Sequence, residues 1–172
     1  MKLSFPSASG RHAEVALHDR SVARVIGRLA QHRARRLFTI DKHHLDAADV
    51  NERLEQMTGA HITAKNFRTR RGTLAAFTCV EAWRDGGSDP EPRLVATADT
   101  TADVLGNTRA VARAHYIHPR VLDAFADGTL EDKVKAGGGH RMPDLGPSER
   151  RLFGFLNVAL DSDMKTAAVD LG

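Results

Sequence analysis

The chain has 172 residues, of which 41% are hydrophobic and 27% are charged, and its formal net charge is +3 at pH 7. This composition predicts one globular domain over 1–172 with a core of its own. No apolar run approaches a membrane span, and the N-terminus lacks the apolar core of a signal peptide, so we expect a cytoplasmic protein without membrane contact. The single Cys79 cannot form an internal disulfide, and we expect a buried thiol in a helix.

Positive charge is concentrated in the N-terminal part of the chain. Residues 1–71 contain 14 Lys and Arg against 7 Asp and Glu, a net +7, whereas residues 72–172 contain 11 against 15, a net −4. A polyanion such as DNA is the natural partner for the basic part, because phosphate contacts supply most non-specific affinity. A basic surface that is simply solvated would give the same composition.

The N-terminal segment is predicted to form a β-hairpin, because apolar and polar residues alternate on both sides of a turn at 7–10. A helix is predicted over 19–32, where apolar residues recur at the spacing of a buried stripe. The basic segment 32–36 then either faces phosphate or forms a solvated helix end. The stripe consists of Val22, Val25, Ile26 and Leu29.

An extended connection at 37–40 leads to a second predicted helix. Asp46 and Asp49 supply capping side chains at its start, and Gly59 ends it. The neighbouring His43 and His44 are predicted to be surface histidines, because no further ligand completes a metal site. The residues predicted to face inward are Val50, Leu54 and Met57.

A third helix is predicted over 63–84 and carries a basic cluster. Arg68 lies at the edge of the predicted core face, beside Lys65 at i−3 and Arg71 at i+3. A guanidinium there can be held by packing and still reach a phosphate, although a salt bridge to an acidic neighbour is the structural alternative. The core face is predicted to contain Phe67, Leu74 and Phe77.

The second half of the chain is predicted to be helical with two breaks. A Pro- and Gly-containing loop at 85–92 precedes a helix over 94–105, and glycines at 137–139 mark a flexible stretch. A helix follows Pro119, and a terminal helix begins at Pro147. The terminal helix is expected to dock on the core through Leu152, Phe153, Phe155 and Leu156.

The segment 105–119 contains the only tyrosine of the chain, Tyr116. Gly106 and Asn107 are turn and cap residues, and a short helix is predicted to start at Thr108 and to present Tyr116 near its end. Asn107 and Tyr116 can converge only if Asn107 lies outside that helix, because nine residues at about 100° each would otherwise place them on opposite sides.

Two motifs together resemble a known family of enzymes. Leu105-Gly106-Asn107-Thr108, followed by a basic helix and Tyr116-Ile117-His118-Pro119, resembles the nucleophile region of bacterial and poxvirus-like type IB DNA topoisomerases. Ala64-Lys65-Asn66-Phe67-Arg68-Thr69 resembles their second catalytic-arginine motif. The resemblance implies a mainly α (α+β) fold, in which a helical catalytic domain of the DNA breaking-rejoining type carries a small N-terminal β-hairpin.

The resemblance also implies roles for individual residues. Tyr116 would attack a phosphodiester and form a 3′-phosphotyrosyl intermediate. Arg68 would stabilise the charge at phosphorus, and Asn107, where many relatives have histidine, would donate a hydrogen bond to the same oxygens. The family needs neither nucleotide nor metal, so no cofactor is expected, and duplex DNA is the expected partner of a nucleoid-associated monomer. The residues expected to contact DNA are Lys65, Arg70, Arg71, Thr108 and Arg113.

The sequence departs from the family at the hairpin turn. Ala8 stands where the family has a lysine that acts as general acid, and Arg11 or Lys2 would have to replace it. The chain is expected to correspond to the C-terminal portion of the catalytic domain, without the N-terminal clamp domain and the region of the first catalytic arginine. Two alternatives remain open, a tyrosine recombinase-like enzyme and a non-catalytic DNA-binding remnant.

Overall fold

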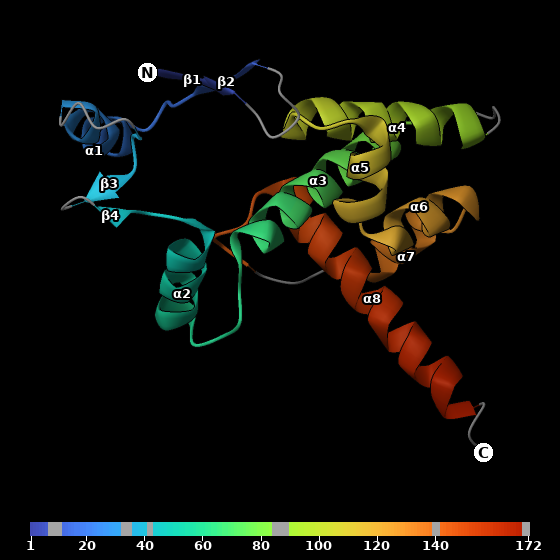
Figure 1. The fold of residues 1–172 in the computed structure, drawn as a ribbon. Coiled ribbons are helices and arrows are strands. Elements are labelled where there is room, and N and C mark those ends of the chain that lie inside the picture. The colour runs from blue at the N-terminus through green and yellow to red at the C-terminus, as the bar shows by residue number, and fades with distance from the viewer. Residues whose placement is uncertain (7–11, 32–35, 41–42, 84–89, 139–141, 170–172) are drawn as a thin grey trace. The chain divides into compact units, whose positions relative to one another are not determined.

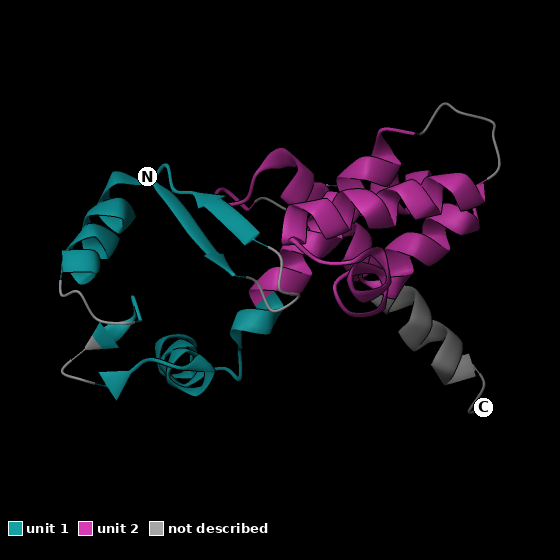
Figure 2. Ribbon diagram, turned by 45° about the horizontal axis from the view of Figure 1, so that its top comes forward, with its two compact units in different colours: residues 1–66 teal, residues 67–172 magenta. Residues whose placement is uncertain are grey.

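The computed structural model describes residues 1–6, 12–31, 36–40, 43–83, 90–138 and 142–169 (Figure 1). Several predicted features lie wholly or partly outside these residues, namely the hairpin turn with Ala8 and Arg11, most of the basic segment 32–36, the first part of the loop at 85–92 and the last glycine of the stretch at 137–139. The chain is mainly helical with a two-stranded N-terminal hairpin, as predicted. It divides into two compact units, residues 1–66 and residues 67–172 (Figure 2).

The predicted hairpin is confirmed in the first unit. Strands β1 (Lys2–Pro6) and β2 (His12–Ala16) pair antiparallel, with Leu3 opposite Val15 and Phe5 opposite Ala13. The alternation that predicted the strands thus also sets their register, because residues two apart share one face of a sheet. A second small sheet, β3 (Thr39–Ile40) with β4 (His43–His44), forms where only an extended connection was predicted.

Helix α1 (Arg20–Gln31) starts where predicted, because Asp19 Oδ1 accepts hydrogen bonds from the backbone N–H groups of Ser21 and Val22. The predicted buried stripe is wrong for most of its length. Ile26 is buried, whereas the side chain of Val25 is 56% exposed and Val22 is also exposed. The spacing correctly places these residues on one face, but no other described element packs extensively against α1 to cover that face.

Helix α2 (Ala47–Thr58) has both predicted ends. Asp46 accepts from the Asp49 backbone N–H while the Asp49 carboxylate accepts from the Asp46 backbone N–H, and this second bond lowers the pKa of Asp49. Gly59 ends the helix in the left-handed conformation at φ 67°. The predicted burial of Val50 and Met57 is wrong, since both side chains are exposed.

The second unit is built from helices. Helix α4 begins at Pro90, earlier than predicted, because proline is well suited to the first turn of a helix. Helix α7 was not predicted from the sequence. Cys79, expected to be buried, is half-buried on α3, with Sγ 3.9 Å from Thr100 Oγ1. The helices are α3 (Ala64–Glu81), α4 (Pro90–Leu105), α5 (Arg109–His115), α6 (Pro119–Ala126), α7 (Leu130–Ala136) and α8 (Pro147–Val169).

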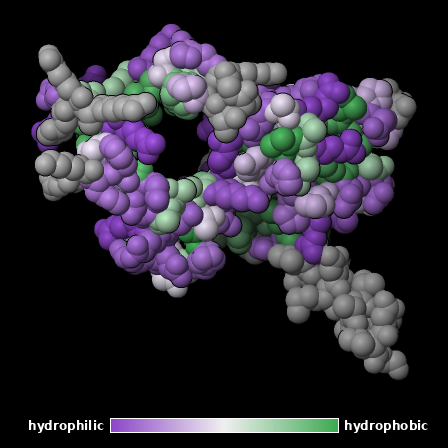
Figure 3. Space-filling view, in the orientation of Figure 1, coloured by the Kyte–Doolittle hydropathy of each residue, from purple (hydrophilic) through white to green (hydrophobic). Residues whose placement is uncertain are grey.

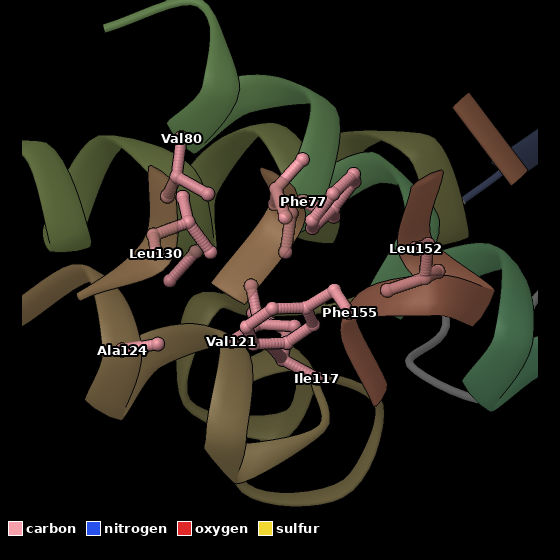
Figure 4. Close-up of a cluster of buried hydrophobic side chains, with 11 residues drawn as sticks. Phe77, Val80, Ile117, Val121, Ala124, Leu130, Leu152 and Phe155 are labelled. Atoms are coloured by element: carbon pink, nitrogen blue, oxygen red, sulfur yellow. The ribbon is translucent and has the colours of Figure 1, made fainter. Parts of the chain in front are cut away.

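The core of this unit gathers around Phe77 on α3 and Phe155 on α8, whose ring centroids are 5.7 Å apart (Figure 4). The docking of the terminal helix through Leu152 and Phe155 is therefore confirmed. Phe67, predicted to share the face of Phe77, is 53% exposed, because ten residues at about 100° each place it about 80° away around the helix. The other core residues labelled in Figure 4 are Val80, Ile117, Val121, Ala124, Leu130 and Leu152.

Hydrophilic residues dominate the face of the molecule shown in Figure 3, with apolar residues interspersed among them. Among the described side chains, nine of the twelve large hydrophobic residues that are exposed belong to residues 1–66, which agrees with the shortage of buried residues in that unit. Within the described ranges, no helix has the length and apolar character needed to cross a membrane.

Helices α7 and α8 cross at two glycines. Gly137, predicted to lie in a flexible stretch, is a buried residue at the C-terminal cap of α7, and its carbonyl lies directly against Gly154 of α8. A Cβ at either glycine would overlap the backbone of the other. The absence of both side chains therefore lets the two backbones meet.

Gly154→Ala is expected to lower the free energy of unfolding by about 1–3 kcal/mol, because a methyl group forced into backbone atoms costs more than the helix propensity gained. Gly27→Ala in α1 is the matched control, since nothing lies within 4 Å of a Cβ built there. The control should be neutral or slightly stabilising. Urea unfolding followed by circular dichroism measures both, and equal midpoints for the two variants would contradict the close crossing.

Candidate active site

Helix α4 ends in a turn that carries Asn107, one of the predicted site residues. Gly106 adopts φ 66°, its N–H donates to the Asp103 carbonyl, and the N–H of Asn107 donates to the Ala102 carbonyl at 2.9 Å. This pair of bonds is a Schellman motif, in which glycine takes the left-handed position that other residues avoid. The motif leaves the carbonyl of Leu105 available to another donor.

Helix α5 presents Tyr116 at its C-terminal end, as predicted. Its N-cap is Thr108, whose hydroxyl accepts a hydrogen bond from the backbone N–H of Val111. Asn107, predicted as a turn and cap residue, directly precedes this cap and lies outside the helix. Tyr116 is the C-cap residue, and its N–H donates to the Ala112 carbonyl at 3.0 Å. The half-buried tyrosine is thus fixed through its backbone at a helix end.

Arg68 of α3 lies against this tyrosine. Its guanidinium carbon is 5.2 Å from the centroid of the Tyr116 ring, within the range of a cation–π interaction. Its Nη2 donates to the Leu105 carbonyl at 3.0 Å. Among the described residues, no carboxylate forms an ion pair with Arg68. The structural alternative, in which Arg68 forms a salt bridge to an acidic neighbour, is therefore not observed among them.

The position of Arg68 has two electrostatic causes. The Leu105 carbonyl belongs to the C-terminus of α4, where unpaired carbonyls carry the negative end of the helix dipole, and a cation is favourable there. The face of an aromatic ring is also negative. One of five guanidinium N–H donors is used by Leu105, so an exposed Arg68 retains donors for an anion.

Asn107 has a side-chain donor without a partner. Its Nδ2 atom is buried, and within the described part of the chain nothing accepts its hydrogens. A buried donor without an acceptor is costly, so such a group often marks a place that a ligand completes. Asn107 is two residues from Leu105, the residue whose carbonyl holds Arg68.

The predicted DNA-contacting residues differ in how they are engaged. Lys65, Arg71 and Arg113 are exposed, whereas Arg70 forms an ion pair with Glu149 and the Thr108 hydroxyl caps α5. Nearby Arg109 is likewise engaged in two hydrogen bonds to the Asp99 carboxylate, at 2.6 and 2.7 Å, which raise the pKa of Arg109. Two of the five predicted DNA-contacting residues are therefore already engaged within the protein.

Two residues at this site were missed by the sequence reasoning. A Cβ built at Gly72 would lie 2.5 Å from the Tyr116 carbonyl oxygen, and the neighbouring Thr73 hydroxyl bonds to the backbone of Tyr116 and His118. The only signal in the sequence was a glycine in the interior of a predicted helix, which indicates close approach of another backbone.

His118 caps helix α6 two residues after the tyrosine. Its Nδ1 accepts from the backbone N–H of Arg120 at 3.3 Å. Burial lowers the pKa of His118, and the positive charge of Arg120 lowers it further, while Asp123 acts weakly in the opposite direction. The neutral imidazole is therefore the form that the fold favours.

We expect the free energy of unfolding to fall as the pH is lowered from 7.5 to 5. The pKa of His118 is lower in the folded than in the unfolded chain, so its stabilising contribution is complete above about pH 6.5 and is lost below it. His118→Asn is the control, because asparagine can cap a helix and does not titrate in this range. Denaturant unfolding at several pH values should show a smaller pH dependence for the variant, and an equal dependence would contradict this role.

A separate cavity of about 300 Å³ lies at the other end of α3, lined by residues that include Val80, Trp83, Arg93 and Phe125. It contains none of the predicted site residues. A site for duplex DNA does not need such a cavity, since phosphates are bound on exposed surfaces. Within the described ranges, no group of three or more His, Cys, Asp or Glu side chains is placed to hold a metal ion.

The structure thus brings Arg68 and Tyr116 into contact and places Asn107 on the adjoining turn, while the remaining predicted residues are surface cations or structural partners. Comparisons of the chain with protein-family models and with curated proteins found no match.

Proposed function

We propose that this chain belongs to the catalytic part of an enzyme that cleaves and rejoins one strand of duplex DNA, as type IB DNA topoisomerases do. The observation that carries the proposal is the contact between Arg68 and Tyr116, because it unites the two motifs on which the family resemblance rests. A nucleophile beside an exposed guanidinium is the arrangement that phosphoryl transfer to tyrosine requires.

The proposed reaction is an in-line displacement at phosphorus. The Tyr116 hydroxyl passes its proton to water as its oxygen bonds to phosphorus. The bond from phosphorus to the 5′ oxygen breaks, and that oxygen leaves and takes up a proton from water. The remaining N–H donors of Arg68 bind the non-bridging oxygens. Asn107 on the adjoining turn is the proposed second donor, and its Nδ2, which is buried and has no acceptor among the described residues, has to become exposed when DNA binds. Rotation of the cut strand about the intact one relaxes supercoils, and reversal of the step then rejoins the strand without a nucleotide or metal cofactor.

Duplex DNA is the proposed partner of a monomer in the cytoplasm, associated with the nucleoid. Four exposed cations, Lys65, Arg68, Arg71 and Arg113, are proposed to neutralise one phosphate each, so affinity should fall about 150-fold between 50 and 200 mM salt. Arg113→Ala should reduce the slope of log affinity against log salt by about one, whereas Arg150→Ala, which removes an exposed charge on α8, should not. Fluorescence anisotropy with labelled duplex measures these slopes, and a salt-independent affinity would contradict the proposed contacts.

The test of the chemistry is covalent attachment to DNA. A nicked duplex with a thiol as the 5′ leaving group should become linked to the protein, and mass spectrometry of the digested adduct should place the phosphate on the peptide that contains Tyr116. A thiol is chosen because it leaves without a general acid, and Ala8 stands where the family has the lysine that acts as general acid. Attachment at another residue would overturn the assignment of Tyr116.

A non-catalytic DNA-binding protein is the second candidate, and one observation favours it. Arg68 already has a structural role, since its guanidinium caps the C-terminus of α4 through the Leu105 carbonyl. The two candidates differ in one result, because a remnant would bind the duplex with the expected salt dependence and form no adduct with the thiol substrate.

A further inference from the structure

The side chain of Thr73 on α3 forms hydrogen bonds to the backbone of the segment that carries Tyr116. The Thr73 hydroxyl donates to the Tyr116 carbonyl at 3.4 Å and accepts from the His118 N–H at 3.1 Å. Thr73 is 4% exposed, so water does not compete for either bond. A single hydroxyl therefore bridges the backbone on both sides of Ile117.

Two further contacts hold the same segment. Ile117 is 5% exposed and belongs to the hydrophobic core, so its side chain anchors the middle of the bridge. The backbone of Tyr116 lies so close to α3 that a Cβ at Gly72 would be 2.5 Å from the Tyr116 carbonyl oxygen and 3.1 Å from the Tyr116 Cβ. The tyrosine backbone is thus held by a core side chain, a hydroxyl bridge and close packing.

The same helix also carries Arg68. Arg68 and Gly72 are one turn apart on α3, so they share a face, and both contact Tyr116. The nucleophile and the guanidinium are therefore positioned by one rigid element. This matters for reactivity, because displacing a reacting group by about 1 Å can cost about 100-fold in rate.

We propose that Thr73 is a positioning residue that holds the Tyr116 backbone in register with Arg68, so that the nucleophile is already in place before DNA binds. The inference rests on the proposed function, in which the Tyr116 oxygen bonds to phosphorus. Thr73 touches neither the phosphate nor the hydroxyl in this scheme and acts only through the backbone.

Three substitutions separate this role from general stability. Thr73→Val keeps the shape of the side chain and removes the hydroxyl, whereas Thr73→Ser keeps the hydroxyl. Thr101→Val is the matched control, because Thr101 is a fully buried threonine on α4 whose hydroxyl, among the described residues, bonds within its own helix to the Thr97 carbonyl at 2.9 Å. All are compared at a temperature at which circular dichroism shows each of them to be folded.

The first measurement is the rate of covalent attachment to the nicked duplex with the thiol leaving group, in which the bond from oxygen to phosphorus forms and the bond from phosphorus to sulfur breaks. At saturating DNA, Thr73→Val should react about 10- to 100-fold more slowly than the unmodified protein. The DNA concentration that gives half the maximal rate should not change. Thr73→Ser should recover most of the rate, and Thr101→Val should equal the unmodified protein.

The second measurement needs no reaction. The chain has one tyrosine, so incorporation of 3-fluorotyrosine gives a fluorine NMR signal that reports on Tyr116 alone. Loss of the hydroxyl bridge in Thr73→Val should broaden or shift this signal, while Thr73→Ser and Thr101→Val should leave it close to that of the unmodified protein.

The outcomes separate the two proposals. An unchanged rate and an unchanged fluorine signal in Thr73→Val would overturn the positioning role, as would an equal loss of rate in Thr101→Val. If the unmodified protein forms no adduct, the proposed function is overturned. The fluorine signal alone then tests whether the Thr73 hydroxyl holds the Tyr116 backbone. In that case a change specific to Thr73→Val supports the bridge, and an unchanged signal rejects it.

Discussion

Replacing Tyr116 by phenylalanine should abolish covalent attachment to the nicked duplex with a thiol leaving group. The substitution removes the attacking oxygen and keeps the ring over which the Arg68 guanidinium lies, so the cation–π contact is preserved. The fold should be unchanged for the same reason. The measurement is the amount of labelled DNA that migrates with the protein on a denaturing gel, with thermal unfolding of both proteins as the control for folding.

The comparison with an ordinary oxygen leaving group makes this result sharper. The unmodified protein should react much more slowly with oxygen than with thiol, because Ala8 cannot supply the proton that the 5′ oxygen needs. A general acid is commonly worth on the order of 100-fold. Attachment that survives Tyr116→Phe would end the case for this residue, and equal rates with the two leaving groups would show that another group acts as the acid.

Arg68→Ala should lower the rate of attachment at saturating DNA by about 100- to 1000-fold, the usual loss when a preorganised donor to a developing charge is removed. The guanidinium also caps α4 and lies over the tyrosine ring, so a loss of about 1 kcal/mol in the free energy of unfolding is expected as well. Arg68→Lys should recover little of the rate, because an ammonium cannot bind two oxygens in parallel.

Two controls distinguish a catalytic arginine from a structural one. Arg150→Ala removes an exposed positive charge from α8, outside the proposed site, and should leave the rate at saturating DNA unchanged. The rate is measured well below the unfolding temperature of Arg68→Ala, so that only folded protein is compared. If Arg68→Ala loses stability and keeps the rate, the arginine is only a cap for α4.

The ends of several elements could be predicted from the sequence. The Asp46 and Asp49 capping box, the stop at Gly59 and the register of the N-terminal hairpin all follow from residues within the element itself. The same holds for the short helix that ends at Tyr116, because Gly106 and Thr108 fix its beginning locally. Local signals of this kind depend on backbone geometry and hydrogen bonds to near neighbours.

Burial was predicted poorly where it depended on a partner. The apolar spacing of Val22 and Val25 placed them on one face of α1, and both are nevertheless exposed. Phe77 is buried because Phe155, far away in the chain, packs against it, whereas Phe67 on the same helix has no such neighbour in the core cluster. Periodicity gives the direction of a side chain, and only tertiary contact decides whether that direction is covered.

For the candidate site as well, some features could be predicted from the sequence and others depended on tertiary contacts. The sequence by itself indicated the groups that we propose to react, because the single tyrosine lies in a basic segment after a turn, and it placed Arg68 at the edge of a helix face. Only the tertiary structure decided that the guanidinium rests on the Leu105 carbonyl and the Tyr116 ring, and that Gly72 and Thr73 hold the tyrosine backbone. Such contacts join positions widely separated in the chain, so they arise from the packing of whole helices and leave almost no local signal.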